Sequence, residues 1–197
     1  MTKDQLYREL NYVNATRESR TKYANLILEN PKLLQPLLEI LFTVNNKISI
    51  RAAWILEFVC KQNIALILPH IGFFISNLSR LRFDSAIRPC AKIVEILIQL
   101  FYKKKAPVIT EALSISNRAA LVEICFDWLI TDQKVAVKAY SMSSLYLLGT
   151  EFDWIQNELK LNLQRNYSSE SAAFKARAKY ILQDFGVNVP RCKSKIR

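Results

Sequence analysis

Residues 48–60 read ISIRAAWILEFVC, and this stretch holds the clearest copy of a pattern that recurs along the chain. In it Arg51 follows the apolar Ile50, and Trp54 and Phe58 stand three and seven residues after Arg51. Residues spaced in this way share one face of an α-helix. The stretch therefore predicts a helix that carries a basic residue at a fixed place beside an apolar face.

The basic residue of this pattern recurs at a nearly regular interval. Copies of the pattern surround five basic residues, which we term the anchors: Arg20, Arg51, Arg88, Lys138 and Lys175. The anchors are spaced 31, 37, 50 and 37 residues apart. A period of this size is typical of helical-hairpin repeats, in which each unit is too small to form a core alone and buries its apolar face on its neighbours.

The residues around the anchors resemble the HEAT repeat. Six positions before the anchors, four of the five residues are helix-capping types, in the series Asn14, Asn45, Arg82, Asp132 and Ser169. In the second helix of a HEAT repeat a capping residue precedes a Val-Arg pair, a small residue and a Leu, and the best match here is Asp132, Val137, Lys138, Ser141 and Leu145. The resemblance implies an all-α fold of armadillo type, an α-α superhelix (HEAT-like solenoid) of about five helical hairpins.

The apolar periodicity gives the expected helix boundaries. We expect paired helices over 2–12 and 14 or 16 to 28, 31–44 and 48–62, 65–78 and 84–102, 117–131 and 133–148, and 153–165 and 169–185, with Gly149 and Gly186 following the last two hairpins. Residues 103–116 account for the longest spacing and are expected to form a mobile insertion or a short helix over 108–113. The solenoid is predicted to span residues 1–186, and residues 187–197 to form a basic, disordered tail.

Composition agrees with a helical protein that has one core. The chain has 197 residues, of which 51% are hydrophobic, and only 3 Gly and 6 Pro. The cysteines Cys60, Cys90, Cys125 and Cys192 are far apart, which favours buried, reduced thiols over disulfides. The N-terminus lacks the apolar segment of a secretory signal, and the apolar run 64–75 is too short to span a bilayer. We therefore expect a cytoplasmic protein without a membrane span.

The formal net charge of +11 suggests nucleic acid as a possible partner. A large part of this charge lies in the run Lys103–Lys105 and in the C-terminal residues 191–197. The distribution therefore argues less strongly for a nucleic-acid surface on the repeats than the total charge does.

No catalytic or metal-binding motif is apparent in the sequence. His70 is the only histidine, and no motif places a metal-ligating carboxylate or a nucleophile at the spacing that would pair with it. The sequence therefore supports neither a histidine-carboxylate metal site nor a nucleophile-histidine pair. The three glycines are scattered singly, which excludes a glycine-rich phosphate loop. The sequence thus predicts no cofactor, no metal and a non-catalytic role.

The candidate binding residues lie on the expected second helices, which we predict to line a concave face. They combine cations, carboxylates and one aromatic residue: Arg51, Trp54, Glu57, Arg88, Lys92, Glu95, Lys134, Lys138 and Lys175. In HEAT-like stacks the anchor position often forms a hydrogen-bonded ladder between repeats, which is one interpretation of the cations. The other is a basic stripe that follows an acidic partner or a phosphate backbone.

The stretches RAAWILEFVC, DQKVAVKAYSM and AAFKARAKYIL also resemble a family of short bacterial helical-repeat proteins that often carry the label adenylosuccinate lyase. That label implies lyase activity as an alternative function. The lyase superfamily has a Gly-Ser-x-x-Met-x-x-Lys-x-Asn loop and several catalytic histidines, whereas this chain has no such loop and one histidine.

Two binding functions follow from the repeat pattern. The first is a non-catalytic interaction module that binds a protein partner on its concave face. The second is nucleic-acid binding of the DNA alkylation repeat type, for whose Trp and Asp base-excision site the nearest match here is Asp127 with Trp128. Carboxylates interleaved with the cations favour a protein partner, and a continuous basic stripe favours nucleic acid.

Overall fold

A computed structural model describes residues 1–187, and over that range it contains helices and no strand. The helices pair into five hairpins: α1 (Lys3–Leu10) with α2 (Arg17–Glu29), α3 (Leu34–Leu41) with α4 (Ile48–Gln62), α5 (Ile71–Asn77) with α6 (Asp84–Tyr102), α8 (Ile115–Ile130) with α9 (Val135–Leu148), and α10 (Asp153–Asn166) with α11 (Ala172–Asp184). The short helix α7 (Pro107–Ala112) lies between the third and fourth hairpins. The predicted all-α solenoid is confirmed.

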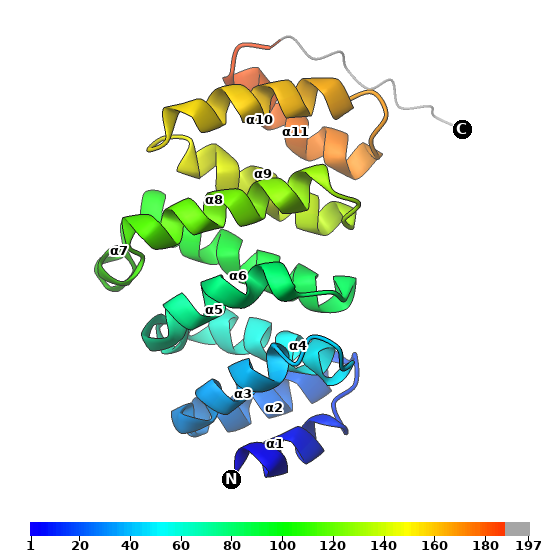
Figure 1. The fold of residues 1–197 in the computed structure, drawn as a ribbon, viewed down its shortest axis with the longest axis vertical. Helices are drawn as coiled ribbons and strands as arrows, with labels where there is room; N and C mark the ends of the chain where they lie inside the picture. The colour runs from blue at the N-terminus through cyan, green and yellow to red at the C-terminus, as the bar shows by residue number, and fades with distance from the viewer. Residues whose placement is uncertain (188–197) are drawn as a thin grey trace.

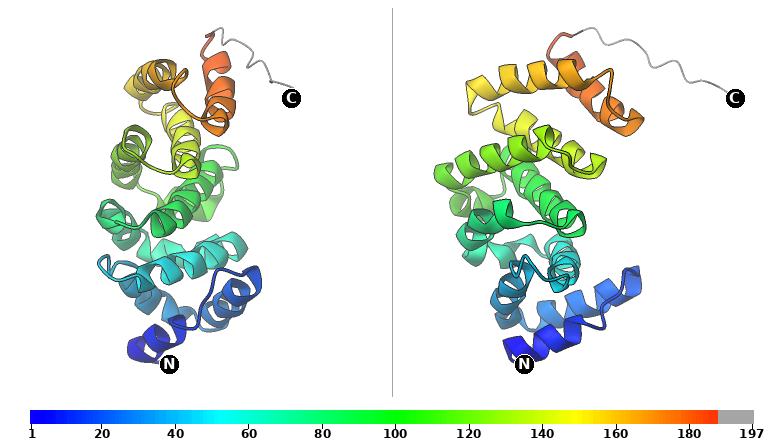
Figure 2. Two further views of the ribbon diagram at one scale, coloured as in Figure 1. Left: turned by 90° about the vertical axis from the view of Figure 1, so that its right-hand side faces the viewer. Right: turned by 45° about the vertical axis from the view of Figure 1, so that its right-hand side comes forward.

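The hairpins stack into an elongated, two-layered molecule (Figure 1). We term α1, α3, α5, α8 and α10 the first-helix layer, and α2, α4, α6, α9 and α11 the second-helix layer. Along the second-helix layer each helix packs on the next, from α2 to α11. Figure 2 shows the two layers side by side, with the first and last hairpins at opposite ends of the stack.

One hydrophobic core runs through the stack from Leu6 to Leu182. Helix α4 shows why it is continuous: Ile55 and Leu56 point in different directions, yet both are fully buried. This follows because α4 packs against α2, α3 and α6 at once. Each repeat therefore completes its core with apolar side chains from the repeats on either side.

Three predicted helix N-caps are wrong by two residues. The N-cap residues of α4, α9 and α11 are Lys47, Lys134 and Ser171, whereas that of α2 is Thr16, one of the two residues predicted for it; each lies four positions before its anchor. The residues six positions before the anchors lie in the preceding loops, where Asn14 shows their role. Its Oδ1 accepts a hydrogen bond from the backbone N–H of Thr16 at 2.9 Å, which forms a turn into the helix.

The helix predicted over residues 65–78 is broken. Residues Ile64–His70 form a 3-10 helix, and α5 begins only at Ile71. Pro69 explains the break, because it has no N–H to donate and its ring hinders an α-helical turn before it. The helix predicted over 31–44 likewise divides into a 3-10 turn at Pro31–Leu33 and α3.

The long segment between the third and fourth hairpins contains the predicted short helix, displaced by one residue. Helix α7 packs on α6 and on the 3-10 segment Ile64–His70, and it buries Ile109. Apart from Val187, the tail that we predict to be disordered lies outside the described residues, and so does Cys192.

Three cysteines lie in the core as free thiols. Cys60, Cys90 and Cys125 are buried in α4, α6 and α8. Burial raises the pKa of each thiol, that of Cys125 to about 12. Each is therefore a protonated, weakly nucleophilic thiol near neutral pH.

Within residues 1–187 no single helix combines the length and the apolar composition of a membrane span. Helix α4 and the following segment Ile64–Arg80 meet both criteria only as a pair, which is bent by 118°.

Candidate binding face on the second-helix layer

The nine predicted site residues are distributed along the second-helix layer. Three lie on α4, three on α6, and the remainder on α9 and α11 or, for Lys134, at the N-cap of α9: Arg51, Trp54, Glu57, Arg88, Lys92, Glu95, Lys134, Lys138 and Lys175. They do not converge on one pocket. Of the nine, only Glu57 and Arg88 line the groove that α2, α4 and α6 form.

Three anchors make a polar contact with a neighbouring hairpin. Arg51 Nη1 donates to Asn11 Oδ1 at 3.1 Å in the first hairpin, and Lys138 Nζ donates to Glu170 Oε1 at 2.6 Å in the fifth. Arg88 Nη2 lies 3.5 Å from Glu57 Oε2 in the second hairpin. These contacts form the ladder between repeats that the anchor spacing suggests, whereas Lys175 donates to the carbonyl of Ser168 within its own hairpin.

Two carboxylates on this layer are almost fully buried. Glu57 and Glu95 are each 2% exposed, and a buried carboxylate is costly unless it is paired. Glu57 Oε1 accepts from Lys61, and Glu95 Oε2 accepts from Lys92 at 2.7 Å. Glu57 Oε2 has the Arg88 guanidinium beside it but no hydrogen bond.

Aromatic rings hold two cations in place. The Arg20 guanidinium lies over the rings of Trp54 and Phe58, 5.6 Å and 5.2 Å from their centroids. The Lys92 ammonium lies 4.9 Å from the ring centroid of Tyr140. Cation-π contacts of this kind fix the charge without neutralising it.

One hollow on this layer is the α2–α4–α6 groove, of about 690 Å³. Its lining is mostly polar and basic: Arg17, Arg20, Thr21, Glu57, Phe58, Lys61, Gln62 and Arg88. Three of these residues, Arg17, Thr21 and Gln62, lie outside the site predicted from the sequence. No motif contains them, because they meet only when α2 packs on α4.

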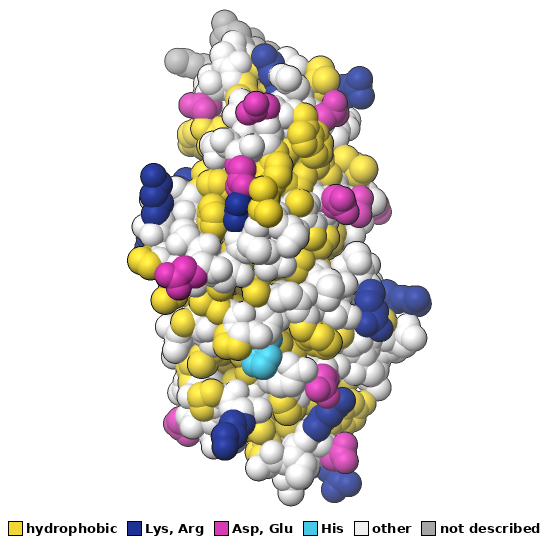
Figure 3. All heavy atoms as spheres, turned by 60° about the vertical axis from the view of Figure 1, so that its left-hand side comes forward, with side chains coloured by type: hydrophobic (Ala, Val, Ile, Leu, Met, Phe, Trp, Pro, Cys, Tyr) yellow, Lys and Arg dark blue, Asp and Glu magenta, His cyan; other side chains and the backbone are white. Residues whose placement is uncertain are grey.

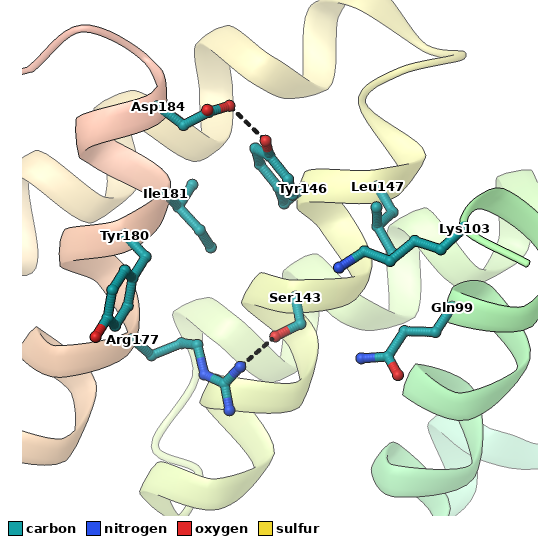
Figure 4. A pocket seen from close by; sticks show the side chains of 9 residues that line it. All are labelled: Gln99, Lys103, Ser143, Tyr146, Leu147, Arg177, Tyr180, Ile181 and Asp184. Atoms are coloured by element: carbon teal, nitrogen blue, oxygen red, sulfur yellow. Dashed lines mark hydrogen bonds between the residues drawn. The ribbon is translucent and has the colours of Figure 1, made fainter.

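Another hollow on this layer is the α6–α9–α11 groove, of about 270 Å³ (Figure 4). Lys103 and Arg177 extend into it from opposite sides, and Arg177 Nη1 donates to Ser143 Oγ at 3.3 Å. At its far end the Tyr146 hydroxyl donates to Asp184, and this hydrogen bond, together with burial, raises the pKa of Tyr146. Tyr146 therefore remains a neutral donor well above neutral pH.

A further face of the molecule, shown in Figure 3, carries charged side chains of both signs scattered among hydrophobic and uncharged ones. Trp128, which we considered as part of a base-excision site, is 6% exposed on α8 in the first-helix layer. A ring buried in this way is not available to stack on a base. Among residues 1–187 no cluster of His, Cys, Asp and Glu has the geometry to hold a metal ion.

The comparisons with known proteins agree with the repeat architecture. A family model for the HEAT repeat domain matches residues 8–185. Searches of curated proteins and of solved structures found no match. The family model covers all five hairpins from within α1 to the end of α11, and the anchors Arg51, Arg88 and Lys138 link successive repeats. The chain belongs to the HEAT repeat family.

Proposed function

We propose that this protein is a non-catalytic interaction module that binds a protein partner on its second-helix layer. HEAT repeats suit this role because stacked hairpins present an extended surface that is larger than any one repeat.

The observation that carries the proposal is the alternation of charge along the layer. The cations Arg88, Lys92, Lys134 and Lys138 each contact a carboxylate, which is Glu57, Glu95, Asp84 or Glu170 respectively. A phosphate backbone running along the layer would meet cations that these carboxylates already neutralise. A protein surface, which itself carries charges of both signs, is the better complement.

Site-specific photocrosslinking in cells tests the proposal. A benzophenone side chain replaces Tyr180 on α11, which is 75% exposed in the second-helix layer. The matched control replaces Trp154 on α10, which is 54% exposed in the first-helix layer of the same hairpin. We expect adducts from position 180 that proteases remove and nucleases do not. Adducts that nucleases remove, or adducts from position 154 alone, would overturn the proposal.

A further inference from the structure

The α2–α4–α6 groove gathers four cations around one carboxylate. Arg17 and Arg20 reach it from α2, Lys61 from α4 and Arg88 from α6, whereas Glu57 is the only acidic residue that lines it. Glu57 is 2% exposed and contacts both Lys61 and Arg88. The groove thus keeps an excess of positive charge at its surface over a buried carboxylate. An anionic ligand would relieve the repulsion among these cations.

Two of the four cations, Arg20 and Lys61, are held in position before any ligand arrives. Arg20 donates from Nε to the carbonyl of Thr16 at 3.3 Å and from Nη2 to the carbonyl of Ala15, so its charge is oriented but not neutralised. Lys61 is fixed by Glu57 and by the Phe58 ring, 5.6 Å from the ammonium. Cations that are already ordered lose little conformational entropy when they bind an anion.

Donor groups remain available in the groove. Within residues 1–187, Arg17 has neither a hydrogen bond nor an ion pair, and the Arg88 guanidinium has one ion-pair contact for its five N–H groups. A guanidinium presents paired donors that match the two oxygens of a carboxylate. The groove can therefore bind two or more carboxylates at the same time.

We propose that the α2–α4–α6 groove binds an acidic peptide segment of a partner protein, rich in Asp and Glu. This inference rests on the proposed function and names the chemistry of the partner. Two neutral polar residues in the groove, Thr21 and Gln62, can bond to a peptide backbone, and half-buried Phe58 offers apolar surface between the charges. Next along the layer, Lys134 and Lys92 are already paired with Asp84 and Glu95, so they offer little attraction to a phosphate backbone that continued past the groove.

The test is fluorescence anisotropy with the full chain at two salt concentrations. The probes are a labelled twelve-residue peptide with alternating Glu, the same peptide with Gln in place of Glu, and a single-stranded oligonucleotide of equal charge. We expect the Glu peptide to bind at least tenfold more tightly than the Gln peptide. Equal affinity of the two peptides, or tighter binding of the oligonucleotide, would overturn the assignment to an acidic peptide.

Matched charge reversals locate the binding. Arg17→Glu changes a groove residue that makes no described polar contact, so the fold should be retained. Arg165→Glu makes the same change in net charge at an exposed position of α10. We expect Arg17→Glu to weaken binding of the Glu peptide about tenfold or more and Arg165→Glu to weaken it less than twofold. Equal losses would show attraction to net charge alone and contradict a site in the groove.

The two proposals fail in different ways. If position 180 crosslinks to protein but the Glu peptide does not bind, the interaction module stands and the acidic-peptide site is wrong. If the Glu peptide binds in the groove but no second-layer adduct forms in cells, the site stands and the proposed extended protein interface is wrong.

Discussion

Arg118 connects three parts of the chain through one guanidinium. It donates to both carboxylate oxygens of Glu151, at 2.8 Å and 2.6 Å, and to the carbonyl of Leu113. It also lies over the Phe101 ring, 4.3 Å from its centroid. The Tyr102 hydroxyl donates to the same carboxylate. A bidentate pair that is further hydrogen-bonded in this way is stronger than an ordinary surface ion pair.

Glu151→Gln should therefore destabilise the protein by about 2 kcal/mol, because the Arg118 side chain, 12% exposed, would lose its counter-charge. Chemical denaturation measures the loss in the free energy of unfolding. Glu39→Gln is the matched control, since the Lys3–Glu39 pair is 51% and 37% exposed and should contribute less than about 1 kcal/mol. Equal losses in the two variants would contradict the stabilising role of the network.

The same carboxylate makes stability depend on pH. The hydrogen bond from Arg118 is the main cause that holds the pKa of Glu151 below its ordinary value of 4.5, against the opposing effect of burial. The folded state therefore binds the proton less readily than the unfolded state, so stability is present above pH 4.5 and is lost as pH falls through the folded-state pKa. We expect the stability difference between wild type and Glu151→Gln to shrink below pH 4.5. A difference that stayed constant down to pH 3 would be inconsistent with this linkage.

At the scale of helices, Gly→Ala substitution is expected to change stability in opposite directions at two glycines. A Cβ atom on Gly149 would meet Gln156 Cγ at 2.9 Å and the Leu145 carbonyl at 3.2 Å, because α10 begins close to the end of α9. A Cβ atom on Gly72 in α5 would meet nothing within 4 Å. Gly149→Ala should cost about 1–3 kcal/mol of stability, and Gly72→Ala should add about 0.5–1 kcal/mol. Thermal unfolding of both variants checks the signs, and a stabilised Gly149→Ala would refute the close approach.

Gly149 also shows a limit of prediction from sequence. We expected Gly149 to follow its helix, at a position that often takes the left-handed conformation. Its φ of −64° is instead helical, and of these two terminal glycines Gly186 alone has a positive φ, of 72°. The prediction that a glycine ends this helix was correct. The reason that glycine is needed at this position is the close approach of the next helix. That approach depends on packing between elements, which no local pattern records.

The helix boundaries were also predicted correctly in some places and wrongly in others. The helices over 48–62 and 84–102 were predicted with their observed bounds, because apolar side chains occur throughout each and both ends are marked. The helix over 65–78 was mistaken, since its apolar pattern continues through Pro69 while its hydrogen bonding does not. Periodicity thus locates a buried face, and proline decides whether that face is carried by an α-helix or a 3-10 turn.

At the scale of the whole molecule, the anchor spacing predicted the stack, and the HEAT resemblance offered the ladder as one interpretation of the anchors, but neither predicted the grooves. The partners Asn11, Glu57 and Glu170 belong to neighbouring hairpins, and the spacing alone does not say which residue each anchor meets. The α2–α4–α6 groove combines residues 17–21 with residues 57–62 and Arg88, so it exists only after three helices have packed. Binding surfaces of repeat proteins are properties of the stack.

Because each hairpin is stabilised by its neighbours, damage at one end should remain local. Leu163 is fully buried on α10, in a hairpin that packs on α9, and Leu97 is fully buried on α6 in the middle of the stack. Each Leu→Ala substitution should cost about 2–5 kcal/mol in the structure that buries it. By hydrogen exchange, Leu163→Ala should speed exchange in α10 and α11 while α4 and α6 keep their protection, and Leu97→Ala should speed exchange throughout. Uniform loss of protection in Leu163→Ala would mean that the stack unfolds as one unit and that no hairpin opens independently of the others.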